Sequence, residues 1–178
     1  MTLSSCWMIK TTALFFGLVA EGLSADPARA TIAPVGERPL APMMKLQDSS
    51  SHAVGLSNYR GRVVLLDFWA TWCGGCKEEL PWFAEFETKY KAQKFSVIAV
   101  SMDEGGWPVV KPFVESLKLP FRVLLDDGQS EKCFAIENMP VAVLIDRHGR
   151  IAAKYVGLVD RGDIEANIRS LLKERKSK

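Results

Sequence analysis

Two cysteines three positions apart are the residues of this 178-residue chain best suited to chemistry. Cys73 and Cys76 directly follow the apolar run 63–69, and an amphipathic helical pattern begins at Lys77. The dithiol is therefore expected where a strand ends and a helix begins. The first turn of a helix has free backbone N–H groups and the positive end of the helix dipole, and both favour a thiolate over a thiol. Because the thiolate is the form that attacks disulfides, the pattern predicts electron exchange with other proteins.

The position of each cysteine predicts its role. Cys73, at the start of the helix, is the predicted nucleophile, partly exposed and with a lowered pKa. Cys76 lies one turn further in, is expected to be buried, and would attack the mixed disulfide to release the reduced partner. Cys6 falls within a candidate signal, so the mature chain would keep three cysteines, and an odd count argues against a disulfide-stapled scaffold. Cys133 is interpreted as a small buried hydrophobe, with a redox role as the alternative.

Two carboxylates are candidates for acid–base work beside the dithiol. Asp67 is the one charged residue of the apolar run 63–69. Burying a lone carboxyl is unfavourable unless it is neutralised, and desolvation raises its pKa, so Asp67 could take the proton from Cys76 as that thiol attacks. A water-bridged structural Asp67 is the alternative. Glu79 follows Cys76 by three residues on the same helix face; it is either functional or solvated, and two such carboxyls would titrate as a coupled pair.

A metal site is the main alternative use of a C-x-x-C pair. Zinc needs about four ligands, and the sequence has no second C-x-x-C and no suitably spaced histidine. A copper chaperone would have cysteines spaced further apart together with a ligand histidine. His52 and His148 both fall in predicted turns, where solvation explains them. We therefore expect no metal and no organic cofactor.

The first thirty residues have the layout of a secretory signal. Lys10 precedes the apolar stretch 11–20, and Ala28-Arg29-Ala30 is a candidate A-x-A cleavage site, with cleavage after Ala25 as a second possibility. The stretch is shorter than the roughly 18 to 20 residues of a spanning helix. We interpret residues 1–30 as a signal peptide or an N-terminal membrane anchor, which predicts export to the periplasm. A net charge of +2 gives no reason to expect nucleic acid binding.

The rest of the chain has the pattern of one α/β domain. Proline-containing residues 31–43 are predicted to be a linker, and 44–178 the domain. Strands and helices alternate and are followed by a hairpin and a final helix, which predicts a central mixed sheet with helices on both faces. The predicted strands are 44–47, 53–56, 63–69, 95–101, 121–125, 141–145 and 151–155, and the predicted helices are 77–91, 109–117, 130–136 and 161–176.

These elements, in this order, resemble the thioredoxin fold, and most closely the exported thioredoxin-like proteins of the TlpA/ResA/CcmG type. The resemblance spans roughly residues 41–172. Its most specific blocks are 56–73, which ends in the first active-site cysteine, and 139–146, which looks like the family's cis-proline loop. The polar residues 48–51 between the predicted strands 44–47 and 53–56 suggest an N-terminal β-hairpin. By resemblance, the segment 101–120 looks like the extra strand–helix insertion of this branch.

The resemblance also implies roles for individual residues. Met139-Pro140 is expected to be cis and to face the cysteines, leaving the Met139 backbone free to pair with an extended substrate. Trp72 resembles an exposed tryptophan that contacts partners, and Glu79 matches a glutamate linked to the acid–base behaviour of the cysteines. Asp67 stands where thioredoxin has Asp and many ResA-like proteins have Asn.

Gly75 departs from the family, which usually has Pro at that position between the cysteines. Glycine loosens the loop and raises the entropy of the dithiol state. The residues between the cysteines tune the redox potential. The sequence does not show whether Gly75 makes this protein more reducing or more oxidising than its relatives. Trp69, by contrast, is expected to be a core residue.

The predicted function is that of an exported thiol–disulfide oxidoreductase. By resemblance it would reduce disulfides of periplasmic proteins, for example apocytochrome c before haem attachment, and a membrane thiol relay would re-reduce Cys73 and Cys76. A peroxiredoxin-like thiol peroxidase is one alternative. That group has a proline and a threonine ahead of its reactive cysteine; here Thr71 precedes Cys73 by two residues, but the proline is missing. A non-catalytic module that binds a thiol partner or copper is another.

Overall fold

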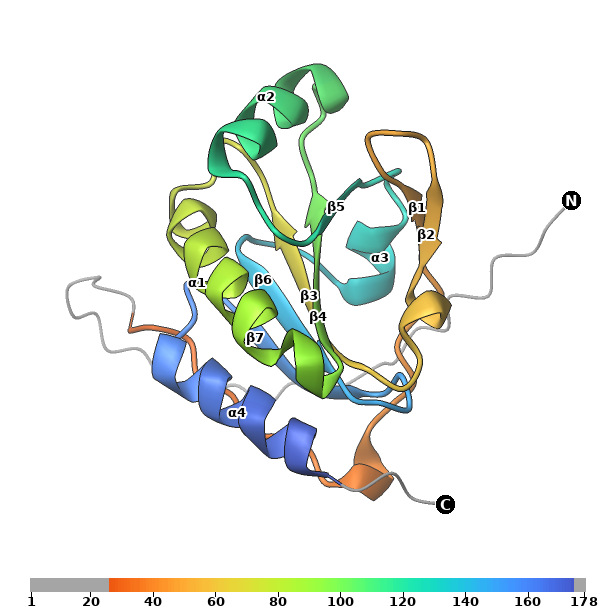
Figure 1. The fold of residues 1–178 in the computed structure, drawn as a ribbon, viewed down its shortest axis with the longest axis vertical. Helices are drawn as coiled ribbons and strands as arrows, with labels where there is room; N and C mark the ends of the chain where they lie inside the picture. The colour runs from red at the N-terminus through yellow and green to blue at the C-terminus, as the bar shows by residue number, and fades with distance from the viewer. Residues whose placement is uncertain (1–25, 175–178) are drawn as a thin grey trace, which may run out of the picture.

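The computed structural model describes residues 26–174, which form a seven-stranded mixed sheet with helices on both faces (Figure 1). The strand order is β2-β1-β5-β4-β3-β6-β7. The strands are β1 (Lys45–Gln47), β2 (Ala53–Gly55), β3 (Val63–Trp69), β4 (Phe95–Ser101), β5 (Arg122–Leu125), β6 (Val141–Ile145) and β7 (Ile151–Val156). The α-helices are α1 (Gly74–Tyr90), α2 (Trp107–Leu117), α3 (Ser130–Phe134) and α4 (Arg161–Lys173). The predicted α/β class with its N-terminal hairpin β1–β2 is confirmed.

Strand β3 lies at the centre of the sheet and is buried along its whole length. It pairs parallel with β4 and antiparallel with β6, so every backbone group has a neighbouring strand available. A strand with sheet on both edges and helices over both faces must be apolar throughout, which explains the run of large hydrophobic residues there. The one exception is Asp67, which is opposite Ala99 on β4 and Ala142 on β6.

The alternating side chains of β3 divide the core in two. Val63 and Leu65 pack with aromatic residues of α1 and with Ile164 of α4, which places these two helices on one face of the sheet (Figure 1). Val64 and Leu66 pack on the other face, with α3 and the hairpin β1–β2. The carboxyl end of β3 therefore lies between the two halves of the core, and the dithiol directly follows this end of the strand.

Helix α2 lies within the segment 101–120 that was expected to be a strand–helix insertion, at the end of the molecule where β3 and β4 finish (Figure 1). The expected strand of that insertion is absent, because β4 ends at Ser101 and the next strand begins only at Arg122. Two helix starts differ from the prediction. Helix α2 begins at Trp107 rather than 109, since Pro108 is compatible with a first turn that needs no N–H. Helix α1 begins at Gly74 rather than Lys77, so the pattern of apolar residues underestimated how close the dithiol lies to the helix start.

The segment 31–43, predicted to be a linker, runs over the surface of the domain and contacts it. Leu40 forms an antiparallel bridge with Arg150. Arg38 is 3% exposed, and its guanidinium contacts Asp146 at 3.1 Å and Glu174 at 2.7 Å. The described part of the chain begins at residue 26. Cys6 and residues 1–25 of the predicted signal or anchor (1–30) therefore lie outside it. Within residues 26–174, none of the helices has the length and apolar character needed to cross a membrane.

Candidate active site

The two cysteines are joined as a disulfide at the first turn of α1. Cys73 and Cys76 are bonded through their sulfurs, with their Cα atoms 5.4 Å apart. Cys73 is the N-cap residue of α1, and its sulfur accepts a hydrogen bond from the backbone N–H of Cys76 at 3.2 Å. A free N–H of the first turn is thus aimed at the Cys73 sulfur, where it would stabilise negative charge. This geometry can open and close an S–S bond.

Cys73 is more buried than expected. We predicted a partly exposed nucleophile, but Cys73 is 6% exposed and Cys76 is 1% exposed in this disulfide state. The prediction was wrong because the turn packs against Trp69 and Ala70 at the end of β3, with Met139 alongside. Trp69 itself is a fully buried core residue, as expected.

Asp103 anchors the turn that carries the dithiol, and the sequence reasoning missed it. Its carboxylate accepts hydrogen bonds from the Thr71 backbone N–H at 3.0 Å, the Thr71 hydroxyl at 2.6 Å and the Ser101 hydroxyl at 2.8 Å. Asp103 is 6% exposed. A signal was available, since Asp103 closely follows β4, which runs parallel to β3, and parallel neighbours end at the same edge of a sheet.

Asp67 is a buried carboxyl with no partner. It is 1% exposed, and neither of its oxygens has a hydrogen-bond partner among residues 26–174. Burial raises its pKa well above the usual range, and the Glu79 carboxyl raises it further. An unpartnered carboxyl of this kind favours the protonated form at neutral pH, so Asp67 is a group that can hold a proton inside the core.

Glu79 is also buried, which excludes the solvated alternative. It is 0% exposed, and its Oε1 accepts a hydrogen bond from the Val159 backbone N–H at 2.7 Å, while Oε2 has no partner in the described chain. Burial raises the pKa of Glu79 to about 7, with a further upward contribution from Glu78 against the lowering effect of the Val159 amide. A group that titrates near neutrality is suited to proton transfer at physiological pH.

The Met139–Pro140 peptide bond is cis, as the resemblance implied. Pro140 lies against the dithiol turn, because a Cβ placed on Gly75 would be 3.5 Å from Cδ of Pro140. The same Cβ would be 3.8 Å from Cβ of Leu158. These are ordinary contact distances, so the space next to Gly75 could accept a larger residue. Trp72 is 68% exposed, which leaves a large aromatic surface beside the cysteines.

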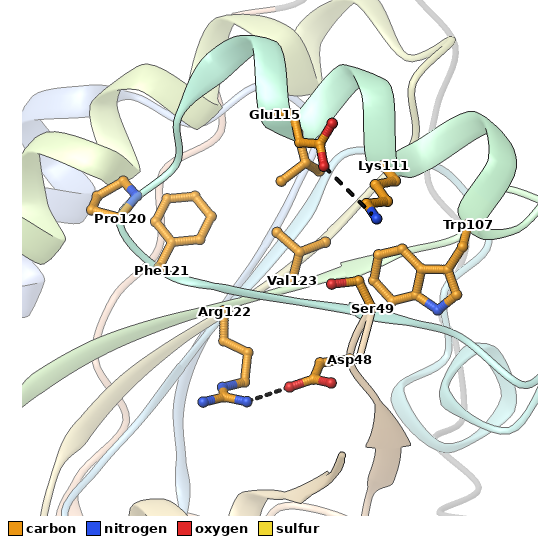
Figure 2. A pocket seen from close by; sticks show the side chains of 10 residues that line it. Asp48, Ser49, Trp107, Lys111, Glu115, Pro120, Phe121, Arg122 and Val123 are labelled. Atoms are coloured by element: carbon orange, nitrogen blue, oxygen red, sulfur yellow. Dashed lines mark hydrogen bonds and ion pairs between the residues drawn. The ribbon is translucent and has the colours of Figure 1, made fainter. Parts of the chain in front are cut away.

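The remaining candidates lie apart from this site. Cys133 is half-buried on α3, packed against the opposite core cluster from Cys73. Within residues 26–174 no three His, Cys, Asp or Glu side chains are grouped to hold a metal ion. A cleft of about 390 Å³ opens between α2, β5 and the tip of the hairpin, where Arg122 pairs with Asp48 and Lys111 with Glu115 (Figure 2). None of the residues lining that cleft is a cysteine or a candidate acid.

The fold and the site together define a thioredoxin-like thiol–disulfide oxidoreductase, with Cys73 and Cys76 as its redox pair. Comparison with known proteins agrees. Residues 38–154 match the sequence profile described as the AhpC/TSA family, and the chain belongs to that family. The thiol-disulfide oxidoreductase ResA of Geobacillus kaustophilus (strain HTA426) is 34% identical over 132 residues, which cover 74% of this chain and 75% of the relative.

Solved structures give the same result. A crystal structure described as a thiol:disulfide interchange protein DsbE from Chlorobium tepidum has a TM-score of 0.72 and 35% identity, and the match covers 76% of this chain and 96% of that one. The solution structure of a thioredoxin-type protein from Neisseria meningitidis has a TM-score of 0.72 and 29% identity, covering 80% and 95%. The family implies that the substrates are disulfides in other proteins.

Proposed function

We propose that this protein is an exported reductant that opens disulfide bonds in periplasmic proteins. The observation that carries the proposal is the arrangement at the start of α1, where the Cys73 sulfur faces a helix N–H and two buried carboxyls lie within the same part of the core. A reductant must supply two electrons and two protons to each disulfide it opens. The dithiol supplies the electrons, and the carboxyls are suited to manage the protons.

The proposed reaction has two exchange steps. In the first, the thiolate of reduced Cys73 attacks one sulfur of the substrate disulfide and forms a mixed disulfide, and the other substrate sulfur leaves as a thiolate that takes up a proton. In the second, Asp67 in its carboxylate form accepts the proton of Cys76 as that thiol attacks Cys73, and the second substrate sulfur leaves as a thiolate that takes up a proton from solvent. The products are the reduced substrate and the Cys73–Cys76 disulfide, the state in which this structure stands. Glu79 would exchange protons with Asp67, since their charges interact.

Substrate binding is proposed at the rim of the dithiol turn. The exposed ring of Trp72 offers apolar contact, and the Met139–Pro140 loop lies beside Gly75. Met139 is half-buried against the same cluster as the cysteines, and its backbone is the proposed partner for an extended segment of the substrate. Such pairing would hold the substrate disulfide over the Cys73 sulfur.

Export and re-reduction complete the proposal. The signal-like N-terminal pattern supports export, and an uncleaved segment would anchor the protein at the outer face of the inner membrane. In an oxidising compartment a reductant needs a renewed supply of electrons, which a membrane thiol relay would deliver to the Cys73–Cys76 disulfide. Apocytochrome c, whose C-x-x-C-H cysteines must be reduced before haem attachment, is the proposed substrate class.

Trapping the mixed disulfide tests the proposal. Cys76→Ser lacks the resolving thiol, so incubation with an oxidised C-x-x-C-H peptide should give a stable adduct, which peptide mapping should place on Cys73. The matched control is Cys76→Ser combined with Cys73→Ser, which should give none. An adduct on Cys133 instead, or no adduct with either this peptide or oxidised insulin, would contradict the proposed function.

A further inference from the structure

The first described residues of the chain pair with the loop that follows β7. Ala28 and Val159 form a parallel bridge. The Ala28 N–H donates to the Leu158 carbonyl at 2.6 Å, and the Asp160 N–H donates to the Ala28 carbonyl at 2.8 Å. Ala28 thus occupies the outer side of the loop 158–160, in the manner of a short extra strand.

The same loop contacts the dithiol site with its inner side. Because successive residues of an extended segment point in opposite directions, the Val159 N–H is turned away from Ala28. It donates to Oε1 of Glu79 at 2.7 Å, and Val159 is 1% exposed. Leu158 lies next to Gly75. Ala28 and Glu79 therefore hold the loop from opposite sides.

Neighbouring bonds keep Ala28 in place. The Ala30 N–H donates to the Asp163 carboxylate at 3.1 Å, and the Asn167 side chain donates to the Ala30 carbonyl at 2.7 Å. Arg29 adds an ion pair with Asp160 at 2.7 Å, but its side chain is 74% exposed, so the backbone and Asn167 bonds dominate. Residues 28–30 thus contact the loop 158–160 and the first turns of α4.

We propose that residues 28–30 form a strap that positions the Val159 amide against Glu79 and keeps water from that carboxyl. The strap is part of the working domain, although the sequence places it in the segment that export would remove. Cleavage after Ala30 would delete the strap, whereas cleavage after Ala25 would preserve it. The effect of the strap on catalysis rests on the role proposed above for Glu79. The effect of the strap on the structure of the loop 158–160 does not depend on that role.

The charges around Glu79 determine the direction of the expected effect. The titratable groups that interact with Glu79 are Asp67 of β3 and Glu78 of its own helix, and the Val159 N–H of the loop donates to it. Burial is the largest influence on the pKa of Glu79, and it acts upward. Releasing the strap admits water to the carboxyl, so its midpoint should fall from about 7 toward the ordinary value of 4.5.

The test uses the full chain with single proline substitutions. Ala28→Pro removes the N–H that donates to Leu158 and places a ring against that carbonyl. Val35→Pro is the matched control: it also follows a proline (Pro34 in place of Pro27), it lies at the first position of a 3-10 turn, and Val35 is exposed. Two quantities are measured on the oxidised protein, namely the exchange rate of the Val159 amide and the carbon-13 titration midpoint of the Glu79 carboxyl, with Glu79→Gln used to assign the signal.

In Ala28→Pro the Val159 amide should exchange at least about fivefold faster, the factor that corresponds to about 1 kcal/mol, and the Glu79 midpoint should fall. The Leu65 amide at the centre of β3 should keep its rate, which shows that the opening is local. Asn167→Ala, which removes the bond to the Ala30 carbonyl, should move both quantities the same way by less. Wild-type values of both quantities in Ala28→Pro, or in Asn167→Ala if the proline variant does not fold, would overturn the strap. Neither quantity involves a substrate, so failure of the proposed reductase function would leave this result standing.

Discussion

Two buried aspartates at the carboxyl ends of neighbouring strands have opposite surroundings. Asp103, just beyond β4, accepts hydrogen bonds from the backbone and hydroxyl of Thr71 and from Ser101. Asp67, near the end of β3, accepts none from the described residues, although it is equally inaccessible to water. Asp67 precedes Cys73 by six residues on β3, whereas Asp103 follows the neighbouring strand β4 and reaches the dithiol turn through its hydrogen bonds to Thr71.

The difference separates a group that holds the structure from a group that is available for chemistry. A buried carboxyl that accepts several hydrogen bonds satisfies its buried donors and fixes their geometry. A buried carboxyl without donors favours protonation and has an unused capacity for proton exchange. We therefore infer that Asp103 positions the turn, and proton transfer by Asp67 together with Glu79 remains the proposed role.

The largest expected effect comes from removing the sulfur of Cys73. Cys73→Ser should abolish reduction of insulin disulfides, because the serine hydroxyl is not ionised at neutral pH and cannot replace the thiolate. Cys133→Ser is the control, and it should retain nearly full activity, since Cys133 packs in the other core cluster. Similar losses in the two variants would show that the dithiol has been assigned incorrectly.

Glu79 should make the stability of the oxidised protein depend on pH. Its pKa is about 7 in the folded state against an ordinary 4.5, so the folded state holds this proton more tightly than the unfolded state does. The stabilising contribution is complete below about pH 4.5 and is lost as pH rises through about 7, a change on the order of 3 kcal/mol at most.

Glu79→Gln tests this contribution directly. Glutamine does not titrate, so the variant should lose less unfolding free energy than wild type between pH 5 and pH 8, as measured by denaturant unfolding with the disulfide intact. Parallel curves for the two proteins over that interval would mean that Glu79 is already ionised at pH 5.

Asp67→Asn should slow the second exchange step. Asparagine has a similar shape but cannot accept the Cys76 proton, so we expect the mixed disulfide to resolve roughly a hundredfold more slowly at pH 7, with the first step nearly unchanged. Acid quenching of the reaction followed by mass spectrometry measures both steps. If the mixed disulfide resolves at the wild-type rate, Asp67 is not the base.

The smallest expected effect concerns stability. Asp103→Ala leaves the Thr71 N–H and the Ser101 hydroxyl without their buried acceptor, so the unfolding free energy should fall by about 2 kcal/mol. Asp67→Ala breaks no hydrogen bond within the described chain and should be clearly less destabilising. Chemical denaturation of both variants at one pH measures the difference, and an equal loss would remove the distinction between the two aspartates.

The sequence was sufficient to predict the fold because local patterns and tertiary packing agree. The continuous apolar run in β3 indicated a central strand, and the spacing of Leu80, Phe83 and Phe86 indicated a helix over the sheet. The structure confirms both. The cysteine pair and the cis bond before Pro140 were also found from motifs, and a disulfide joins the predicted pair.

The partners of the site could not be predicted in the same way, because they come from distant parts of the chain. Glu79 accepts a hydrogen bond from the backbone N–H of Val159, which is 80 residues later in the chain. The loop that contains Val159 is in turn paired with Ala28. No local pattern distinguishes a glutamate that such a loop covers from a glutamate in water. The exposure of Cys73 was predicted incorrectly for the same reason, since it depends on how the turn packs against the end of β3 and Met139.

The protonation state of Asp67 is the most direct test of this account. Infrared difference spectra between wild type and Asp67→Asn, recorded on the oxidised protein at pH 7, report whether that side chain is a carboxylic acid or a carboxylate. We expect the carbonyl stretch of a protonated carboxyl in wild type and its absence in the variant. Carboxylate bands at that position at pH 7 would contradict the conclusion that burial without donors keeps Asp67 protonated in the oxidised protein, the state reached after it has accepted the Cys76 proton.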